Sequence, residues 1–323
     1  MSVTLDKLRA LRQQAGHATV TPAEPPLTAA IRHPLPALAL AQRSLPAAND
    51  PLPAVDAITA LRRLLGGRGR RPLATPVRGA VDRALPGEEI APGLRLIESR
   101  IPLAVPQAAL ALAFARRVDH VDPGALLFFD TETTGLAGGT GTRAFMIGAA
   151  DWHHHPLQGD GLRIRQLLIT TLAAEHAMLR TFAGWLAPHT VLSSYNGRCY
   201  DAPLLKTRYR LARMDDPISG LDHVDLLFPS RRRYRGTWEN CRLATIEREL
   251  LRIVREDDLP GSEAPAAWLS YLRGGSAHNL RRVAAHNHQD VVTLALLLLR
   301  LHAVHAAENP MAPGVDVAAT QRP

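Results

Sequence analysis

The sequence has few cysteines and no apolar leader. Its two cysteines, Cys199 and Cys241, form no C-x-x-C pair, which argues against a disulfide framework or a structural zinc site. We expect both to remain reduced in a cytosol. The N-terminus lacks the apolar core of a signal peptide, and no stretch of membrane-spanning length is free of charge. These absences predict a cytoplasmic protein that is not embedded in a membrane.

Lysine and aromatic residues are also scarce. Lys7 and Lys206 are the only lysines, so arginine carries nearly all of the positive charge in a chain of net charge +8. This excess favours a polyanionic partner such as nucleic acid, because guanidinium groups bind phosphates bidentately. A genome rich in G and C would produce the same arginine bias. The aromatic content of 5% argues against an extensive base-stacking platform.

Residues 1–90 differ in composition from the rest of the chain. They contain 11 of the 25 prolines and carry 12 basic against 7 acidic residues. Short amphipathic helices are predicted for the opening dozen residues and for residues 54–65, but large apolar residues are too few for a packed core. We therefore expect a largely disordered or linker-like segment over 1–90, a globular domain over 91–305 and a disordered tail over 306–323. The basic stretch 66–72 is either a solvated tether or a nucleic-acid contact.

The globular part alternates strand and helix patterns. Residues 93–103 are typical of a strand or a covering segment, and the pattern after them predicts strands at 125–130, 142–152, 162–169, 190–196 and 223–227. Helices are predicted at 173–186 and 201–214, and most of 242–305 is predicted to be helical. The order indicates an α/β domain with a mixed five-stranded sheet, in which three antiparallel strands precede parallel ones and helices cover both faces.

One stretch, LLFFDTETTGL at 126–136, ends a buried strand in two carboxylates. Asp130 and Glu132 are two residues apart, so both side chains leave the strand on the same side. Carboxylates held this close repel each other unless a cation lies between them, and Mg²⁺ or Mn²⁺ is the usual one. Taken alone, the same pattern also fits a strand followed by a polar turn.

Three more acidic residues lie where they could join this pair. Asp201 follows a strand and begins a helix, where it could equally serve as an N-cap. Asp290 is the only acid in an apolar helix and therefore needs a partner, which could be a metal or one of the arginines. His286 lies one turn before Asp290 on the same helix face, where it could act as a general base or be a core histidine. Asp225 is a lesser candidate, as an indirect ligand or a helix cap.

Two motifs are interpreted as structural. His153–His155 are predicted to lie in a turn between strands and to be a surface loop, because consecutive side chains in a turn diverge. The glycines of GLAGGTGTR at 135–143 are followed by a strand, whereas a phosphate-binding P-loop opens a helix. A wide hairpin turn is therefore expected there, and it would border the site because it begins at the carboxylates.

Taken together, the motifs F-D-T-E-T-T-G, Y-N-G-x-x-Y-D and H-N-x-x-D resemble those of the DEDD (DnaQ-like) exonuclease superfamily. The stretches FFDTETTGLAGGTGTRAFMIG, SYNGRCYDAPLLKTRYRL, HVDLLFPSRRRYR, IERELLRIVREDDLPG and HNHQDVVTLALL resemble more specifically the YprB-type ribonuclease H-like domain. The likeness covers roughly residues 120–302 and leaves the N-terminal segment unexplained. It implies a ribonuclease H-like fold and a 3′–5′ exonuclease that acts on DNA or RNA, at a single-stranded end.

The resemblance also implies roles for individual residues. Asp130, Glu132, Asp201 and Asp290 would hold two Mg²⁺ or Mn²⁺ ions. His286 would accept the proton of the attacking water, although it stands at the spacing where the superfamily usually has tyrosine, so activation of the water by the metal alone stays open. Thr133, Asn196 and Tyr200 belong to the motifs and are candidate substrate contacts.

Further contacts with the substrate are expected from residues outside the motifs. Candidate phosphate contacts are Arg143, Lys206, Arg208 and the run 231–233, and candidate stacking residues are Tyr195, Tyr234 and Trp238. Each could equally be an ordinary surface or half-buried side chain. Alternatives to an exonuclease are a non-catalytic nucleic-acid-binding or scaffold module and a structure-specific endonuclease, both on the same fold.

Overall fold

The computed structural model describes residues 81–135, 140–156 and 159–309. The chain divides into two units, Met1–Leu73 and Ala74–Pro323, and every described residue belongs to the second unit. The two helices predicted within residues 1–65 therefore lie outside the described residues. Of the tail predicted for residues 306–323, only residues 306–309 are described.

A seven-stranded mixed sheet forms the centre of the described domain, and its strand order is β1-β2-β7-β6-β5-β8-β9. Antiparallel pairing joins the strands from β1 to β5, while β5, β8 and β9 are parallel. The strands are β1 (Glu88–Ala91), β2 (Leu94–Ile101), β5 (Leu126–Thr133), β6 (Ala144–His155), β7 (Gly159–Ile169), β8 (Val191–Ser194) and β9 (Asp222–Asp225). A separate two-stranded sheet pairs β3 (Leu110–Ala111) with β4 (His120–Val121).

The alternation of side chains along the central strand β5 divides the core into two layers. Phe129 faces one layer, where its ring lies 6.2 Å from that of Phe182 in helix α3 (Glu175–Ala183). Phe128 faces the other layer and makes an edge contact with Trp152. Because side chains alternate along a strand, Asp130 and Glu132 emerge on the face of Phe128, as the sequence predicts.

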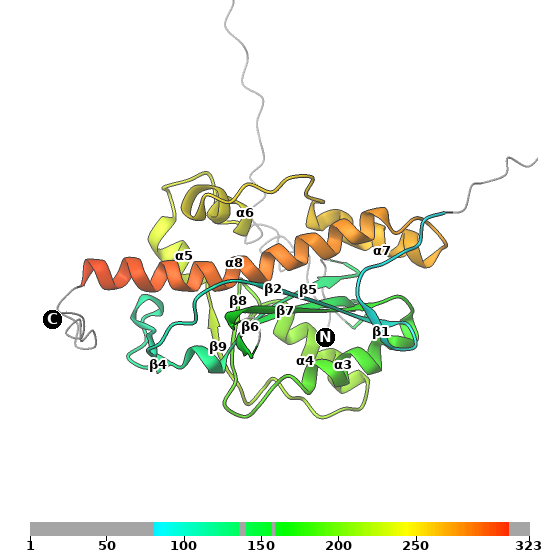
Figure 1. The fold of residues 1–323 in the computed structure, drawn as a ribbon, viewed down its shortest axis with the longest axis horizontal. Coiled ribbons are helices and arrows are strands. Elements are labelled where there is room, and N and C mark those ends of the chain that lie inside the picture. The colour runs from blue at the N-terminus through cyan, green and yellow to red at the C-terminus, as the bar shows by residue number, and fades with distance from the viewer. Residues whose placement is uncertain (1–80, 136–139, 157–158, 310–323) are drawn as a thin grey trace, which may run out of the picture. The chain divides into compact units, whose positions relative to one another are not determined.

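Helices cover both faces of the sheet (Figure 1). Helices α3 and α4 (Asp201–Leu211) lie on one face. The other face is crossed by α8 (His278–Glu308), with α7 (Ala264–Leu272), α5 (Leu227–Tyr234) and the short α6 (Leu243–Ile246) beside it. By length and composition α8 could cross a membrane. A buried core helix passes the same test, and Leu294, Leu297 and Leu298 are buried against the sheet.

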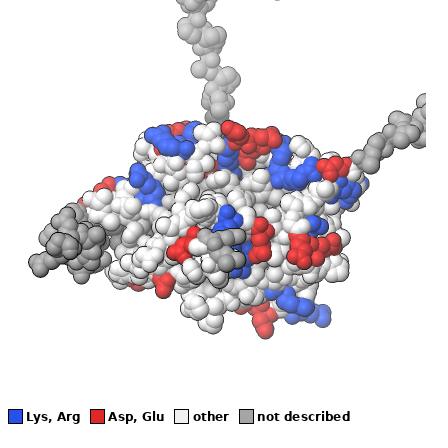
Figure 2. Space-filling view, in the orientation of Figure 1, with Lys and Arg blue, Asp and Glu red and all other residues white. Residues whose placement is uncertain are grey.

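The structure extends the expected sheet and moves one motif. Two further strands continue the antiparallel side, so the sheet has seven strands rather than five. One of them, β2, lies in the stretch that is predicted to be a strand or a covering segment, and the other, β1, is not predicted from the sequence. His153–His155 form the end of β6 and pair with Gly159–Gly161, so the predicted turn is wrong at these residues. The polar triplet belongs to the strand because its backbone continues the antiparallel pairing of β6 with β7. Figure 2 shows basic and acidic side chains interspersed on one face of the domain.

Candidate metal centre

Asp130 and Glu132 meet helix α8 at the end of β5. The side-chain amide of Asn287 donates a hydrogen bond to Asp130 Oδ2 at 3.0 Å, and Glu132 is buried with 7% of its surface exposed. Burial raises the pKa of both carboxyls well above their ordinary values, and the charges of Asp290 and Asp201 raise them further. Two buried carboxyls with raised pKa values form a site that would gain from a bound cation.

Asp201 reaches the end of β5 from the opposite face. It begins α4, and its carboxylate accepts a hydrogen bond from the hydroxyl of Thr131, the residue between Asp130 and Glu132. Burial raises the pKa of Asp201 from its ordinary value of 3.8 to about 6. Gly197 gives the loop before α4 its close approach, because a Cβ there would lie 2.5 Å from Ser194 Oγ and 3.1 Å from Asp201 Oδ2.

Asp290 pairs with an arginine as well as lying beside the other carboxylates. The guanidinium of Arg255 donates to Asp290 Oδ1 and, through two hydrogen bonds of 2.6 and 2.7 Å, to the buried carboxylate of Glu247. Thr293, one turn after Asp290, donates to the same Glu247 carboxylate. Of the two partners suggested by the sequence for Asp290, a metal or an arginine, the arginine is therefore present as Arg255.

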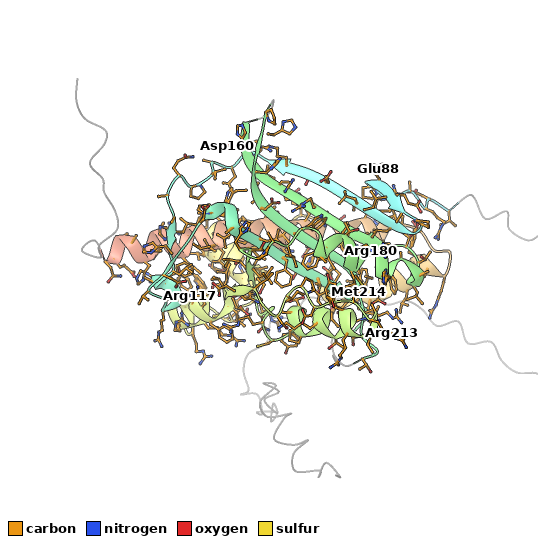
Figure 3. The ribbon with its side chains drawn as sticks, turned by 90° about the horizontal axis from the view of Figure 1, so that it is seen from below. Glu88, Arg117, Asp160, Arg180, Arg213 and Met214 are labelled. Atoms are coloured by element: carbon orange, nitrogen blue, oxygen red, sulfur yellow. The ribbon has the colours of Figure 1, made fainter. Side chains whose placement is uncertain are left out.

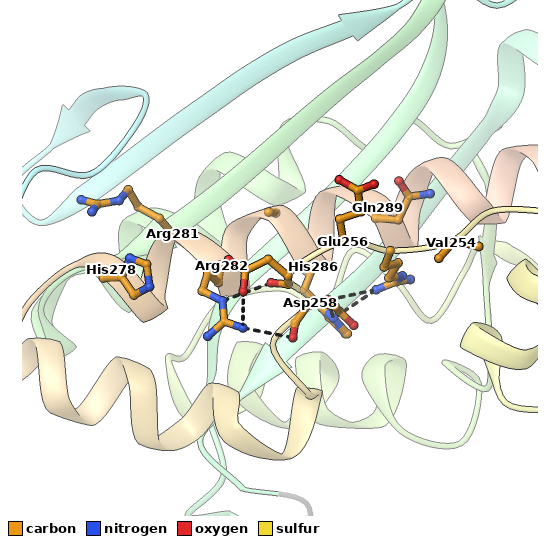
Figure 4. Close-up of a pocket in the computed structure, with 11 residues that line it drawn as sticks. Val254, Glu256, Asp258, His278, Arg281, Arg282, His286 and Gln289 are labelled. Carbon is orange, nitrogen blue, oxygen red and sulfur yellow. Dashed lines mark hydrogen bonds and ion pairs between the residues drawn. The ribbon is translucent and has the colours of Figure 1, made fainter.

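His286 has its two ring nitrogens in different surroundings. Nδ1 lies 2.7 Å from Asp258 Oδ1 and 3.0 Å from Arg255 Nη1, whereas Nε2 lies 3.5 Å from Asp290 Oδ2. These two neighbours favour opposite tautomers: Asp258 accepts from a protonated Nδ1, which leaves Nε2 free to accept a proton, whereas Arg255 can donate only to an unprotonated Nδ1. A cavity of 610 Å³ opens beside this pair, and Figure 4 shows Asp258 and His286 on its wall next to Arg282.

A buried amide network holds α8 against the sheet at this point. Gln166 in β7 donates to the backbone oxygen of Ala284 at 2.8 Å and to Asn287 Oδ1 at 2.9 Å. Gly148 in β6 is the strand partner of Gln166, and a Cβ at Gly148 would come within 2.1 Å of Asn287 Oδ1. A glycine is therefore required here for the side chain of Asn287 to reach Asp130.

The donor set fits hard divalent cations. Glu132, His286 and Asp290 each present a ligand atom, and these atoms lie within 4.8 Å of one another. Asp130 and Asp201 are not in that set, but Asp130 lies on the same face of β5 as Glu132, and the charge of Asp201 raises the pKa of both Asp130 and Glu132. Several carboxylate oxygens with one imidazole suit Mg²⁺ or Mn²⁺ better than a softer metal.

The candidate substrate contacts have varied surroundings. Tyr200 is 62% exposed, and Thr133 donates to the backbone oxygen of Gly135 at 3.0 Å. Asn196 has a left-handed backbone with φ of 70°, and its backbone N–H donates to the carboxylate of Asp225. Arg143 is ion-paired with Glu175, while Lys206 lines a separate surface cavity beside Asp215 and Asp216. These five residues stay predictions as substrate contacts.

Arg208 is expected from the sequence to contact phosphate, and its surroundings in the structure contradict that expectation. It is 5% exposed and donates two hydrogen bonds, of 2.6 and 2.8 Å, to the carboxylate of Glu175. A third bond, of 3.0 Å, reaches the backbone oxygen of Thr140 in the hairpin after β5. Since its donors are turned inward, Arg208 braces that hairpin and does not contact phosphate.

Asp225 is a structural residue. Its carboxylate accepts hydrogen bonds from the backbone amides of Asn196, Arg198 and Leu227, at 2.7, 3.1 and 3.0 Å. It therefore fixes the loop before α4 and the start of α5, which is close to the capping role suggested for it.

Sequence reasoning missed four residues around the carboxylates: Glu247, Arg255, Asp258 and Asn287. A signal existed for Asn287, which is the second residue of the motif H-N-x-x-D. The other three lie in IERELLRIVREDDLPG, whose acids and arginines had no assigned role because no periodicity connects them with α8.

Comparisons with known proteins cover the same part of the chain. The model of the RNase_H superfamily matches residues 127–302. The uncharacterized protein YprB of Bacillus subtilis is 34% identical over 177 residues, which is 54% of this chain and 41% of that protein. The match thus spans about two fifths of that relative's length.

Solved structures with low similarity include two nucleic-acid enzymes. The family B DNA polymerase of Pyrobaculum calidifontis is 16% identical, with a TM-score of 0.38, over 59% of this chain and 25% of that one. Exonuclease I of E. coli, in a zinc-bound complex with single-stranded DNA, is 15% identical, with a TM-score of 0.32, over 49% and 42%. The assignment rests on the superfamily model and the sheet order, because these scores are low. The match to the superfamily model covers more than half of the chain, and the chain therefore belongs to the RNase H superfamily.

Proposed function

We propose that this chain is a metal-dependent nuclease that hydrolyses phosphodiester bonds, with 3′–5′ exonuclease polarity. The observation that carries the proposal is the convergence of Asp130, Glu132, Asp201 and Asp290 on the end of β5, from one strand and two helices. Burial raises the pKa of the first three carboxyls, with the neighbouring charges adding to this for Asp130 and Glu132. Superfamily membership supports a nuclease, and the polarity follows from the resemblance of the motifs.

The four carboxylates would hold two Mg²⁺ or Mn²⁺ ions. Glu132 and Asp290 lie together and would share one ion with Asp130, while Asp201 would bind the second with Asp130. Bound cations of this kind polarise the scissile phosphate and stabilise the attacking and leaving oxygens. Arg255 now contacts Asp290, so binding of metal would replace part of that ion pair.

His286 would act on the attacking water. Asp258 holds Nδ1, which orients the ring and leaves Nε2 directed towards Asp290 and the carboxylate group. A general base in this position typically contributes 10²- to 10⁴-fold, on the order of 3–5 kcal/mol in the barrier. The arrangement supports a histidine base at the spacing where tyrosine is usual.

The substrate is expected to be the single-stranded end of DNA or RNA, in the cytoplasm. This rests on the excess of arginine and on the motifs, together with Tyr200, whose exposed ring stands directly before the ligand Asp201. An exposed ring at this position is suited to stack on a terminal base.

Cleavage of end-labelled single strands tests the proposal. With Mn²⁺ or Mg²⁺, a 5′-labelled strand should give a descending ladder, and a 3′-labelled strand should release its label in the first step. Asp130→Asn should reduce the rate by at least about 100-fold, because a ligand shared by both ions is lost. Cleavage that starts inside the strand would favour an endonuclease. Equal rates for Asp130→Asn and the parent, or no metal-dependent cleavage of DNA or RNA, would favour a binding module.

A further inference from the structure

Two adjoining cavities lie along the edge strand β9 and helix α5. The first, of 380 Å³, is lined by Arg117, Arg198 and Phe228, and the second, of 250 Å³, by Arg116 and His305. Pro229 and Arg232 line both, so the two form one continuous groove. Figure 3 shows Arg117 at the end of the domain where α8 finishes.

Three arginines of this groove lack an acidic partner. Within the described part of the chain, Arg116 and Arg198 make no side-chain hydrogen bond or ion pair, and Arg232 donates only to the backbone oxygen of Phe114 at 3.2 Å. Arg116 and Arg232 line the same cavity, and burial together with the charge of Arg116 lowers the pKa of Arg232. Two like charges in one cavity are stabilised by an anion between them.

The acidic residues that line the groove do not neutralise these arginines. Asp222 is paired with Arg117, which it meets at 2.6 Å. The carboxylate of Asp225 accepts three backbone hydrogen bonds, one of them from the amide of Arg198. The lining of the two cavities holds five arginines against two aspartates, so the groove keeps an excess of positive charge.

An exposed aromatic ring lies among these arginines. Phe228 lines the first cavity and is 41% exposed, although it belongs to a helix whose neighbouring residues Leu227 and Pro229 are buried. A basic groove that follows the backbone, combined with an aromatic ring that stacks on bases, is how proteins bind single-stranded nucleic acid. An acidic peptide would use the arginines but would leave the ring without a role.

The first cavity reaches the loop that precedes Asp201, because Arg198 of that loop lines it. Arg198 follows Gly197, which packs against Asp201, and Asp225 fixes the loop that contains both. At the other end, His305 lies 15 residues after Asp290 on α8, which corresponds to about 22 Å. At about 3.4 Å per nucleotide of one strand, that length corresponds to roughly six nucleotides, and to fewer if the strand is extended.

We propose that this groove binds the sugar–phosphate backbone of a single strand whose end lies at the carboxylates. Arg116, Arg198 and Arg232 contact phosphates, and Phe228 stacks on one base. The placement of the strand's end at the carboxylates rests on the proposed function, but binding of the strand in the groove does not. The test therefore measures binding under conditions in which no cleavage occurs.

The test compares Arg116→Gln/Arg232→Gln with the parent protein in EDTA, using fluorescent oligonucleotides of 15 and 3 nucleotides over a series of salt concentrations. For the 15-mer we expect the Kd to rise at least fivefold and the slope of log K against log[salt] to fall by about 1.4, because two phosphate contacts are lost. The trinucleotide is too short to reach Arg116 in the second cavity and, of the two replaced arginines, can contact only Arg232, so its Kd should rise less than that of the 15-mer.

Arg273→Gln is the matched control. This exposed arginine lies at the end of α7, before α8 begins, and is roughly 40 Å from His305 along that helix. It should leave the Kd and the slope unchanged. Phe228→Leu keeps the charge and should weaken binding of the 15-mer about fivefold or more, with no change in slope.

The proposal is overturned if Arg116→Gln/Arg232→Gln, folded by circular dichroism, binds the 15-mer with the affinity and the slope of the parent. The groove would then have another occupant, such as an acidic protein. If only the groove proposal is wrong, the parent protein still cleaves the 15-mer in the presence of metal. If only the proposed function is wrong, the parent protein does not cleave the 15-mer but still binds it in a salt-dependent manner.

Discussion

Replacing Gly148 with alanine should disable the metal centre without changing any of its ligands. The added Cβ would lie 2.1 Å from Asn287 Oδ1 and 2.8 Å from its Cγ, far inside van der Waals contact. Asn287 is completely buried on the central helix α8, so its side chain has no open space to enter. Either its rotamer or the helix itself must move away from β6.

The size of the effect follows from the contacts that such a movement breaks. Overpacking of a buried site costs about 1–3 kcal/mol. The movement also weakens the hydrogen bonds of Asn287 with Asp130 and Gln166, and a buried polar group left without a partner costs about 1–3 kcal/mol. We therefore expect the free energy of unfolding to fall by about 2–6 kcal/mol.

Urea denaturation measures that loss, and isothermal titration calorimetry with Mn²⁺ measures its consequence at the site. Affinity for Mn²⁺ should fall at least tenfold, since α8 carries Asp290. Gly220→Ala is the matched control, because a Cβ there would have no neighbour within 4 Å. A Gly148→Ala protein with the stability and the Mn²⁺ affinity of the control would refute the packing argument.

Three further predictions concern charges at the site. Asp258→Asn should lower kcat about tenfold or more with little change in KM, because the orientation of the His286 ring is lost, and Asp258→Glu should restore part of the rate. Arg255→Met should destabilise the metal-free protein by about 3–5 kcal/mol in urea, because it leaves Asp290 and a second buried carboxylate unpaired, and saturating Mn²⁺ should recover part of that loss. The pKa of Asp201, about 6 rather than 3.8, means that the folded state binds the proton more tightly, so the metal-free protein should lose up to about 3 kcal/mol of stability as pH rises from 4 to 7. Thermal melts at pH 5 and pH 7.5 check this, and Mn²⁺ should raise the Tm more at pH 7.5.

Two of the candidate ligands stand out in the sequence because each adjoins a long apolar run. Asp130 ends a buried strand, and Asp290 is the only acid between residues 284 and 302 of α8. The two-residue spacing of Asp130 and Glu132 fixes their common face without any knowledge of the fold.

The surroundings of those ligands could not be predicted in the same way. Arg255 and Asp258 lie in an irregular segment between α6 and α7, and only tertiary packing brings them to α8. The requirement for glycine at Gly148 depends on the position of a side chain 139 residues later in the chain. The added edge strand β1 is short and exposed, and so lacks the apolar alternation that identifies a buried strand.

Anomalous scattering from crystals soaked in Mn²⁺ tests most directly whether these carboxylates form a metal centre. The account predicts two manganese peaks at the end of β5, both contacted by Asp130, one also by Glu132 and Asp290 and the other by Asp201. It also predicts that Arg255 releases Asp290 in that structure. Crystals without manganese at these residues, with Arg255 still bound to Asp290, would contradict it.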